Sequence, residues 1–378
     1  MKKRTFFASL VALMLVLAAC GGDSASDTTA GAVGADTTEA VTETTEAMTE
    51  TTEAMTETTE ATTADVGGAD NPIQVLFVPS VSADEIVAGG DLLAAALSDA
   101  TGLTFEVSVP SSYAATIEEI CANPAASMGF IPAQAYVLAS ELCGVDIQLK
   151  AERFGYTEYW AQYLVPRDSE AASLEDLSGL SWAYPDPGST SGFLVPSGEL
   201  TNLGIEVGEE FEAGSHDGAV RAVYNGEAEF GTSFYSPFTD VDRVSAWDGD
   251  PANADIPDDV VDSCALNDDG EIQCGDFVVQ DARRNLREEL PDVVQQVKIL
   301  AVSAPIPNDG VAFGPEFPED LKAQIVDALA AFAADDPEGF ATAFDAYSWD
   351  NVAPTTDADF DSIRAIVQAL GIELGDIG

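Results

Sequence analysis

The chain of 378 residues has 67 acidic and 14 basic side chains, which gives a net charge of −53, and residues 71–378 alone carry −44. This charge excludes nucleic acid as a partner, because a phosphate backbone requires a basic surface. The same segment is long enough to bury two hydrophobic cores.

The first twenty residues have the pattern of an export signal. Basic residues at positions 2–4 precede an apolar run over 6–17, which is too short to span a membrane comfortably. The sequence Leu-Ala-Ala-Cys at 17–20 resembles the lipobox of bacterial lipoproteins. We expect residues 1–19 to be a signal peptide and Cys20 to become the lipidated first residue. The alternative is a signal without lipidation.

Residues 20–70 are predicted to be a tether. The heptad Thr-Glu-Thr-Thr-Glu-Ala-Met begins at Thr42 and Thr49 and, with its last residue changed, at Thr56. One Ala-Met pair per repeat forms no apolar seam, and the glutamates have no cationic partners, so a coiled coil is excluded. We expect a disordered, self-repelling linker that holds the folded part away from the membrane.

Four cysteines remain once Cys20 is lipidated. An even number in an exported chain favours local disulfides, which would join Cys121 to Cys143 and Cys264 to Cys274. Metal binding is the alternative, but neither a CxxC spacing nor a neighbouring histidine supports it. We therefore expect two disulfides, no metal and no cofactor.

From residue 71 onward the pattern alternates between strands and helices, which predicts an α/β fold with crossover connections and parallel sheets. The first set comprises strands 73–78, 103–109 and 126–131 and helices 84–100, 117–121 and 136–142. The second set comprises strands 181–184 and 228–232, a helix after Ser189 and a helix at 219–224. Two long extended segments and two C-terminal amphipathic helices complete the pattern, at 156–166, 297–307, 319–334 and 359–370.

The two extended segments divide the chain into lobes. A chain that leaves one lobe, builds another and returns makes two connections between them. We expect the first lobe to comprise 71–160 and 301–378, and the second to comprise 161–300. An acidic, Pro- and Asp-rich stretch, 242–277, interrupts the second lobe. Its oxygen-bearing residues lack the spacing of a calcium loop, so a solvated surface insertion is expected.

The most informative segment is Asp-Pro-Gly-Ser-Thr-Ser-Gly at 186–192. Its Pro-Gly turn ends a strand and places the hydroxyls of Ser189, Thr190 and Ser191 at a helix start, where the first N–H groups lack partners. Unpaired amides, hydroxyl donors and the positive end of the helix dipole attract anions. The alternative is that these hydroxyls only cap the helix.

Several short motifs then follow one another in a recognisable order. They are Tyr-Ala-Ala at 113–115, Tyr-Trp at 159–160, the segment 186–196, Ser-His-Asp at 215–217, Asn-Gly-Glu-Ala at 225–228 and Ile-Pro-Asn-Asp at 306–309. Together they resemble the phosphonate, phosphite and phosphate substrate-binding proteins of ABC importers, a branch of the type II periplasmic-binding-protein fold. The resemblance covers most of 71–345. It implies a monomeric, extracytoplasmic two-lobe receptor that delivers its ligand to a membrane permease.

The resemblance also implies seven ligand-binding residues, which are Tyr113, Tyr159, Ser189, Thr190, Ser191, His216 and Asp309. The hydroxyls at 189–191 would hold the phosphoryl oxygens, with Tyr113 and His216 as further donors and Tyr159 facing the fourth substituent. Asp309 would accept the P–OH proton of the ligand and so reject sulfate, which has none.

The segment 233–237 departs from the family pattern. Members that hold an aminoalkyl phosphonate place a carboxylate there, whereas this chain has Ser-Phe-Tyr-Ser-Pro. We expect a ligand whose fourth substituent is small or apolar, such as phosphite, phosphate or a short alkylphosphonate.

Two other functions compete with import. A hydrolase would use Ser189 or Ser191 with His216, but the chain has no Gly-x-Ser-x-Gly elbow, and one histidine does not suffice for a metal-dependent phosphatase. A binding protein that serves a sensor instead of an importer would have the same sequence pattern. We therefore expect a receptor without enzymatic activity.

Overall fold

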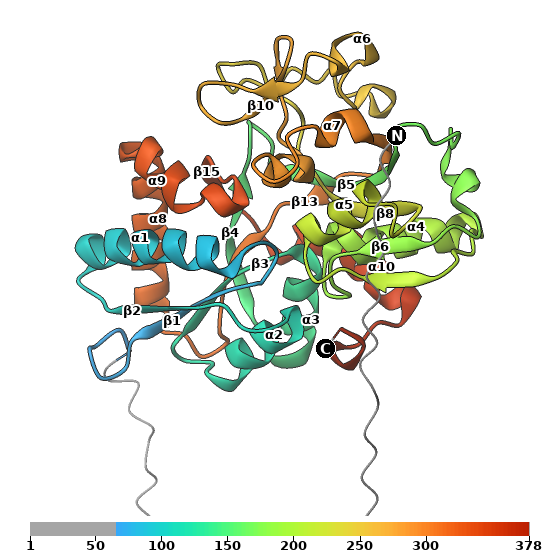
Figure 1. The fold of residues 1–378 in the computed structure, drawn as a ribbon. Helices are drawn as coiled ribbons and strands as arrows, with labels where there is room; N and C mark the ends of the chain where they lie inside the picture. The colour runs from blue at the N-terminus through green and yellow to red at the C-terminus, as the bar shows by residue number, and fades with distance from the viewer. Residues whose placement is uncertain (1–65, 378) are drawn as a thin grey trace, which may run out of the picture. The chain divides into compact units, whose positions relative to one another are not determined.

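The computed structural model describes residues 66–377, which contain two large β-sheets and one small sheet (Figure 1). The expected signal peptide, the lipidated Cys20 and most of the tether lie outside these residues. Val66 is buried, and the backbone N–H of Gly67 donates to the carbonyl of Asn71 at 2.9 Å. The folded part therefore includes the last five residues of the expected tether, because the Val66 side chain packs into the core.

The first sheet has six strands in the order β15-β4-β14-β3-β1-β2. Their bounds are β1 Ile73–Phe77, β2 Phe105–Ser108, β3 Ser127–Ile131, β4 Asp146–Glu152, β14 Gly310–Phe313 and β15 Asn351–Pro354. Strand β1 is parallel to both β2 and β3, whereas β14 and β15 are antiparallel to their neighbours.

The second sheet has the order β12-β5-β8-β6-β7, with β13 paired to one end of β5. The bounds are β5 Glu158–Pro166, β6 Trp182–Tyr184, β7 Glu210–Glu212, β8 Phe230–Tyr235, β12 Val297–Val302 and β13 Ile306–Pro307. Strands β7, β6 and β8 are parallel, but β5 and β12 run antiparallel to their neighbours. The prediction of parallel sheets is thus correct for the crossover units and wrong for β14 and β15 in the first sheet and for β5 and β12 in the second.

Helices cover both large sheets, with α1 against β2, α8 against β15 and α5 against β8 (Figure 1). The bounds are α1 Ala83–Thr101, α2 Tyr113–Ala122, α3 Ala133–Cys143, α4 Val195–Leu203, α5 His216–Tyr224, α6 Asp258–Val261, α7 Val293–Gln296, α8 Glu319–Asp335, α9 Pro337–Ala343 and α10 Asp361–Leu370. In residues 66–377 no helix combines the length and the apolar character needed to cross a bilayer.

Two helices begin about one turn earlier than predicted because a serine caps each of them. The Ser112 side chain accepts a hydrogen bond from the Ala115 N–H at 3.1 Å, and α2 therefore begins at Tyr113. The Ser215 side chain accepts one from the Gly218 N–H at 3.0 Å, and α5 begins at His216. The early starts place a candidate ligand-binding side chain in the first turn of each helix.

The two predicted connecting segments lie side by side. Strand β5 pairs at its start with β13 and along the rest of its length with β12 and β8. The second segment is not one extended run, because residues 303–305 interrupt it between β12 and β13. Both connections between the sheets therefore pass through one region, in which their strands are paired.

The insertion at 242–277 is mostly exposed, as predicted, but it also has regular structure and a buried side that the sequence did not indicate (Figure 1, gold). Strands β9 Ala265–Leu266, β10 Ile272–Cys274 and β11 Phe277–Val278 form a small antiparallel sheet. Trp247 of this segment is buried, and its ring centroid lies 5.0 Å from that of Trp160 on β5. The predicted disulfides, Cys264–Cys274 here and Cys121–Cys143 between α2 and α3, are both present.

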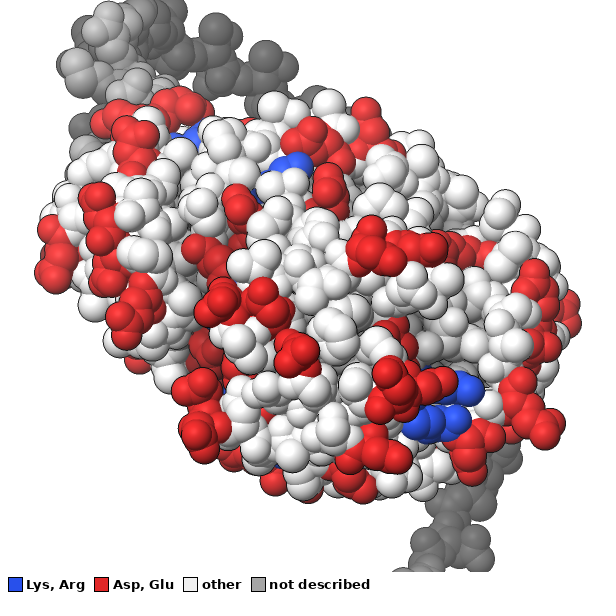
Figure 2. Space-filling model, turned by 90° about the horizontal axis from the view of Figure 1, so that it is seen from above, with Lys and Arg blue, Asp and Glu red and all other residues white. Residues whose placement is uncertain are grey.

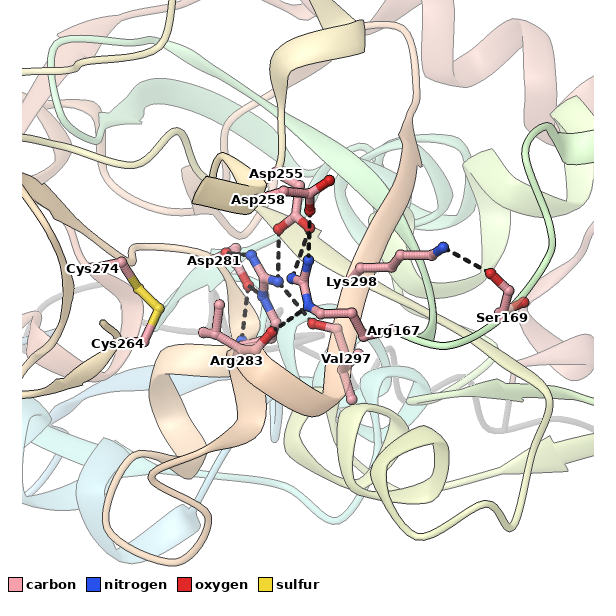
Figure 3. Close-up of polar contacts among 11 residues, drawn as sticks. Arg167, Ser169, Asp255, Asp258, Cys264, Cys274, Asp281, Arg283, Val297 and Lys298 are labelled. Carbon is pink, nitrogen blue, oxygen red and sulfur yellow. Dashed lines mark hydrogen bonds and ion pairs between the residues drawn. A yellow bond between two sulfur atoms is a disulfide. The ribbon is translucent and has the colours of Figure 1, made fainter. Parts of the chain in front are cut away.

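A cluster of ion pairs joins the insertion to the second sheet (Figure 3). Asp255 of the insertion lies between two guanidinium groups, 2.9 Å from Nη2 of Arg167 and 2.8 Å from Nη1 of Arg283. Arg283 also contacts the Asp281 carboxylate at 2.9 Å. These buried contacts hold the insertion against the ends of β5 and β12.

Candidate functional site

All seven predicted ligand-binding residues line one cavity of about 50 Å³. They are Tyr113, Tyr159, Ser189, Thr190, Ser191, His216 and Asp309. Further lining residues follow the carboxyl ends of strands, with Ser80 after β1, Pro132 after β3 and Arg153 after β4. Ligands of α/β proteins bind at this edge of a sheet. Ser189, His216 and Asp309, which are far apart in sequence, therefore share one site.

Helix starts converge on the cavity. Tyr113 and His216 are the first residues of α2 and α5, Pro132 directly precedes α3, and Thr190 begins the turn that leads into α4. Each start contributes unpaired N–H groups and the positive end of a helix dipole. Acidic side chains are spread over the molecular face in Figure 2, and basic side chains occur in few places there. The site can thus attract an anion locally against the repulsion of the acidic surface.

The hydroxyl-rich helix start is a π-helical turn, Thr190–Leu194. The Ser189 hydroxyl caps it by accepting the Gly192 N–H at 3.1 Å, so the capping interpretation is correct for this serine. The backbone N–H groups of Thr190 and Ser191 have no acceptor within residues 66–377, although both residues are buried. The residues that line this part of the cavity thus offer two unpaired amides and three hydroxyls, which is the donor set of an oxyanion site.

His216 belongs to a short chain of hydrogen bonds. Its Nε2 lies 3.3 Å from the Ser189 hydroxyl, and its Nδ1 lies 2.9 Å from the Ser233 hydroxyl. Burial, followed by the positive charge of Arg153, lowers the pKa of His216 from 6.5 to about 3. The imidazole is therefore neutral at pH 7, and it acts through a hydrogen bond and not through charge.

The depressed pKa of His216 predicts a pH effect on stability. Between pH 6.5 and 3 the unfolded chain binds a proton that the buried imidazole does not, so His216 lowers the free energy of unfolding as the pH falls through this window. At pH 5 the loss is about 2 kcal/mol. We expect the stability difference between the wild type and His216→Gln to shift by this amount between pH 8 and pH 5, as measured by urea unfolding. The acidic groups titrate in both proteins and cancel, so parallel pH profiles would refute the effect.

The two candidate tyrosines supply protonated phenols. Burial, and next the charge of Asp186, raises the pKa of Tyr113. Burial, and next the charge of Asp309, raises the pKa of Tyr159. The Tyr113 hydroxyl forms no hydrogen bond to any residue in the described range, so its proton is free for a ligand.

Arg153 is the main site residue that the sequence analysis missed. Its Nε donates to the Tyr347 carbonyl at 2.7 Å, its Nη1 to the Asn308 side-chain oxygen at 2.6 Å, and its Nη2 to Asp309 Oδ2. Basic side chains are rare in this chain, with only 11 in residues 71–378, and this rarity was the sequence signal that could have identified Arg153. Arg153 also directly precedes a Phe-Gly turn at the end of β4, a strand that the sequence analysis did not identify.

The ion pair changes the role expected of Asp309. Asp309 would reject sulfate by charge repulsion only if its carboxylate were left without a compensating positive charge when the ligand brings no proton. The structure instead pairs Asp309 with Arg153, whose side chain is 9% exposed. Repulsion by an isolated charge therefore cannot be the basis of selectivity, and any selectivity has to come from the pattern of donors and acceptors.

Part of the cavity lining is apolar, with Val78, Val81, Phe234 and Ala346 among the lining residues. From the 233–237 segment, Phe234 and Ser236 line the cavity. Asp309 is the one carboxylate among the lining residues of the described chain, and it is paired with Arg153. The lining therefore holds no free carboxylate for an ammonium group.

Hydrogen bonds connect the two sides of the cavity, among them one from the Gln134 side-chain Nε2 to the Pro187 carbonyl at 3.1 Å. The Gln134 N–H, at the start of α3, donates to the Thr190 hydroxyl at 2.9 Å. The His216 N–H donates to the Ser80 carbonyl at 3.3 Å. Residues attached to the first sheet thus contact residues attached to the second directly at the site.

Comparisons with known proteins identify the family. The family described as the periplasmic substrate-binding protein of an ABC transporter for phosphonate matches residues 75–360. The phosphate-import protein PhnD of Mycolicibacterium smegmatis is 26% identical over 326 residues, which cover 81% of this chain and 88% of that protein.

Solved structures confirm the predicted two-lobe fold. A binding protein component of an ABC phosphonate transporter from Pseudomonas aeruginosa superposes with a TM-score of 0.59 at 17% identity, covering 78% of this chain and 85% of that one. PhnD1 from Prochlorococcus marinus, solved in complex with methylphosphonate, gives a TM-score of 0.59 at 14% identity and covers 79% of this chain and 98% of that one. At these identities the likeness concerns the fold alone.

Proposed function

The chain belongs to the phosphonate-binding family of periplasmic substrate-binding proteins of ABC transporters, and from this premise we propose that its cavity holds one small phosphorus oxyanion. The observation that carries the proposal is the convergence of seven predicted residues on a single enclosed volume. The ligands we propose are phosphite, phosphate and methylphosphonate.

The size of the cavity supports a ligand of this class. A buried water occupies about 10–15 Å³ on the same measure, so 50 Å³ holds roughly three to five such groups. Phosphite, phosphate and methylphosphonate have four or five non-hydrogen atoms. The apolar lining residues, Phe234 among them, suit a P–H or P–CH₃ group and the hydroxyls at 189–191 suit a fourth oxygen, whereas a long or cationic substituent would have neither space nor a counter-charge.

We propose that the ligand is bound by closure of the two lobes, each built on one large sheet. The amides and hydroxyls at 189–191 and the neutral His216 would bind the oxyanion from the second lobe. Tyr113, from the first lobe, would donate to the same oxyanion. A ligand that contacts both lobes favours the closed arrangement, and the paired strands β5 and β12 would act as the hinge.

The Ser189–His216 contact resembles part of a hydrolase site, but its environment argues against catalysis. The second ring nitrogen of His216 contacts the Ser233 hydroxyl and not a carboxylate. With a pKa of about 3, the imidazole is also a poor general base at neutral pH. We therefore propose a receptor that binds its ligand without transforming it.

The family places the protein outside the cytoplasm. We propose that Cys20 carries a lipid anchor, that residues 20–65 span the distance from the membrane, and that the protein works as a monomer with an ABC permease. Delivery to a sensor is the alternative, because both partners would receive the same closed receptor.

A ligand panel tests the proposed function. We expect methylphosphonate, phosphite or phosphate to raise the melting temperature of the mature protein and to bind with a micromolar or lower Kd in calorimetry, about −8 kcal/mol or more favourable. Aminoethylphosphonate and ATP should bind far more weakly, because the one carboxylate in the cavity lining is paired with Arg153 and the cavity is too small for a nucleotide. Failure of all three small oxyanions to bind would contradict the proposal.

A further inference from the structure

Arg153 is held rigidly at the edge of the cavity. Its side chain is 9% exposed, and three acceptors fix its guanidinium: the Tyr347 carbonyl, the Asn308 side-chain oxygen and Asp309 Oδ2. Asn308 cannot rotate freely, because its Nδ2 donates to the Ala151 and Tyr156 carbonyls, both at 3.0 Å. The arginine is therefore preorganised by the hinge region before any ligand arrives.

Both members of the ion pair line the cavity and keep unused hydrogen-bonding capacity. A guanidinium has five N–H groups. Three of those in Arg153 are used, so two have no acceptor within residues 66–377. Asp309 Oδ1 receives no hydrogen bond from any described residue. The pair thus presents a donor next to an acceptor.

We propose that Arg153 is a ligand-binding, specificity-determining residue, and that it and Asp309 together recognise the neighbouring P–O⁻ and P–OH groups of a monoprotonated phosphorus oxyanion. A free N–H of Arg153 donates to the unprotonated oxygen, and Asp309 Oδ1 accepts the P–OH proton. This inference rests on the proposed function and adds to it the arrangement of acceptor and donor groups on the ligand that the site recognises.

The donor on Arg153 and the acceptor on Asp309 together explain selectivity against sulfate without an isolated buried charge. Sulfate can accept from Arg153 but cannot donate to Asp309, so one carboxylate oxygen would lose water and gain no partner. Before binding, the charges of Arg153 and Asp309 cancel, and His216 is neutral. The ligand's charge is then balanced by the converging helix starts.

Single and double substitutions in the mature protein test the pair, with methylphosphonate and sulfate as probes in calorimetry. Arg153→Gln should weaken methylphosphonate binding about 10- to 100-fold. Asp309→Asn should narrow the gap between methylphosphonate and sulfate, because an amide can donate to sulfate. The double variant, Arg153→Gln with Asp309→Asn, should lose less binding free energy for methylphosphonate than the sum of the losses in the two single variants. Arg221→Gln, at an exposed ion pair with Glu289, is the matched control for charge and should change neither Kd.

Two outcomes would overturn the inference. The first is that Arg153→Gln binds methylphosphonate with a Kd within twofold of the wild-type value. The second is that Asp309→Asn leaves the ratio of the methylphosphonate and sulfate affinities unchanged. If Arg153 had only a structural role, Arg153→Gln would lower the melting temperature and leave the ratio of the methylphosphonate and sulfate affinities unchanged. If Arg153→Gln does not fold, Arg153→Lys replaces it, because lysine keeps the charge but lacks the fork, and it should still weaken methylphosphonate binding at least fivefold. A wild type that binds no phosphorus oxyanion would instead contradict the proposed function itself.

Discussion

Replacement of Arg283 by methionine should lower the free energy of unfolding by about 3–5 kcal/mol. Arg283 is 1% exposed, and its Nε and Nη2 each contact the Asp281 carboxylate at 2.9 Å. Its Nη1 donates to the Val297 carbonyl at 3.0 Å and lies 2.8 Å from Asp255 (Figure 3). Methionine fills much of the volume but leaves the buried Asp281 without a cation. Urea unfolding at pH 7 measures the loss.

Two variants separate this effect from a general loss of charge. Arg221→Met removes an exposed arginine paired with Glu289 and should cost no more than about 1 kcal/mol. Adding Asp281→Leu to Arg283→Met removes the stranded carboxylate and should restore part of the stability. An equal loss in Arg221→Met and Arg283→Met, or no recovery in the double variant, would be inconsistent with a buried ionic anchor for the insertion.

Local signals were sufficient to predict the crossover units of the fold. Strand β1, helix α1 and strand β3 were identifiable because an unbroken apolar run or an amphipathic period is visible in a single segment. Strands β4, β14 and β15 were not identified. Each is paired on the first sheet with a strand distant in sequence, as β14 is with β3, and such pairing leaves no local pattern.

The amino-acid composition of the insertion did not indicate its buried residues, for a related reason. Residues 242–277 are rich in Asp and Pro, which suggests a solvated loop, but Trp247 and Ile272 are buried. The apolar residues are too widely spaced along the sequence to show the periodic pattern of a helix or a strand. Packing against β5 orders the segment, together with the ionic cluster around Asp255.

The site was predictable to the extent that its residues stand at helix starts. Ser189 and His216 could be identified because a capping position and a unique histidine are visible in the sequence. Arg153 could not, because its role arises from three partners that lie between 155 and 194 residues away along the chain. Only the fold brings these partners to the end of β4.

A methyl group added at Gly188 should weaken ligand binding about 5- to 150-fold, equivalent to about 1–3 kcal/mol. Gly188 lies in the loop after β6, and a Cβ atom there would lie 2.5 Å from the Cβ of Tyr113 at the start of α2. Both Cβ atoms are attached to the backbone, so no rotamer change relieves the clash. The two elements belong to different sheets and meet at the cavity, so Gly188→Ala should oppose closure and leave each lobe folded. Calorimetry with methylphosphonate measures the loss of affinity.

The control for this prediction is Gly375→Ala, where an added Cβ meets no atom within 4 Å. This variant should bind methylphosphonate as the wild type does. Gly188→Ala should keep the ligand-free melting temperature within a few degrees, because the clash disappears when the lobes separate. Normal affinity in Gly188→Ala would show that binding does not require Tyr113 and the 186–192 loop to approach this closely, and closure would then have to occur by a different movement of the lobes. A large fall in melting temperature would locate the effect within one lobe instead, since a clash confined to the closed form cannot destabilise the open one.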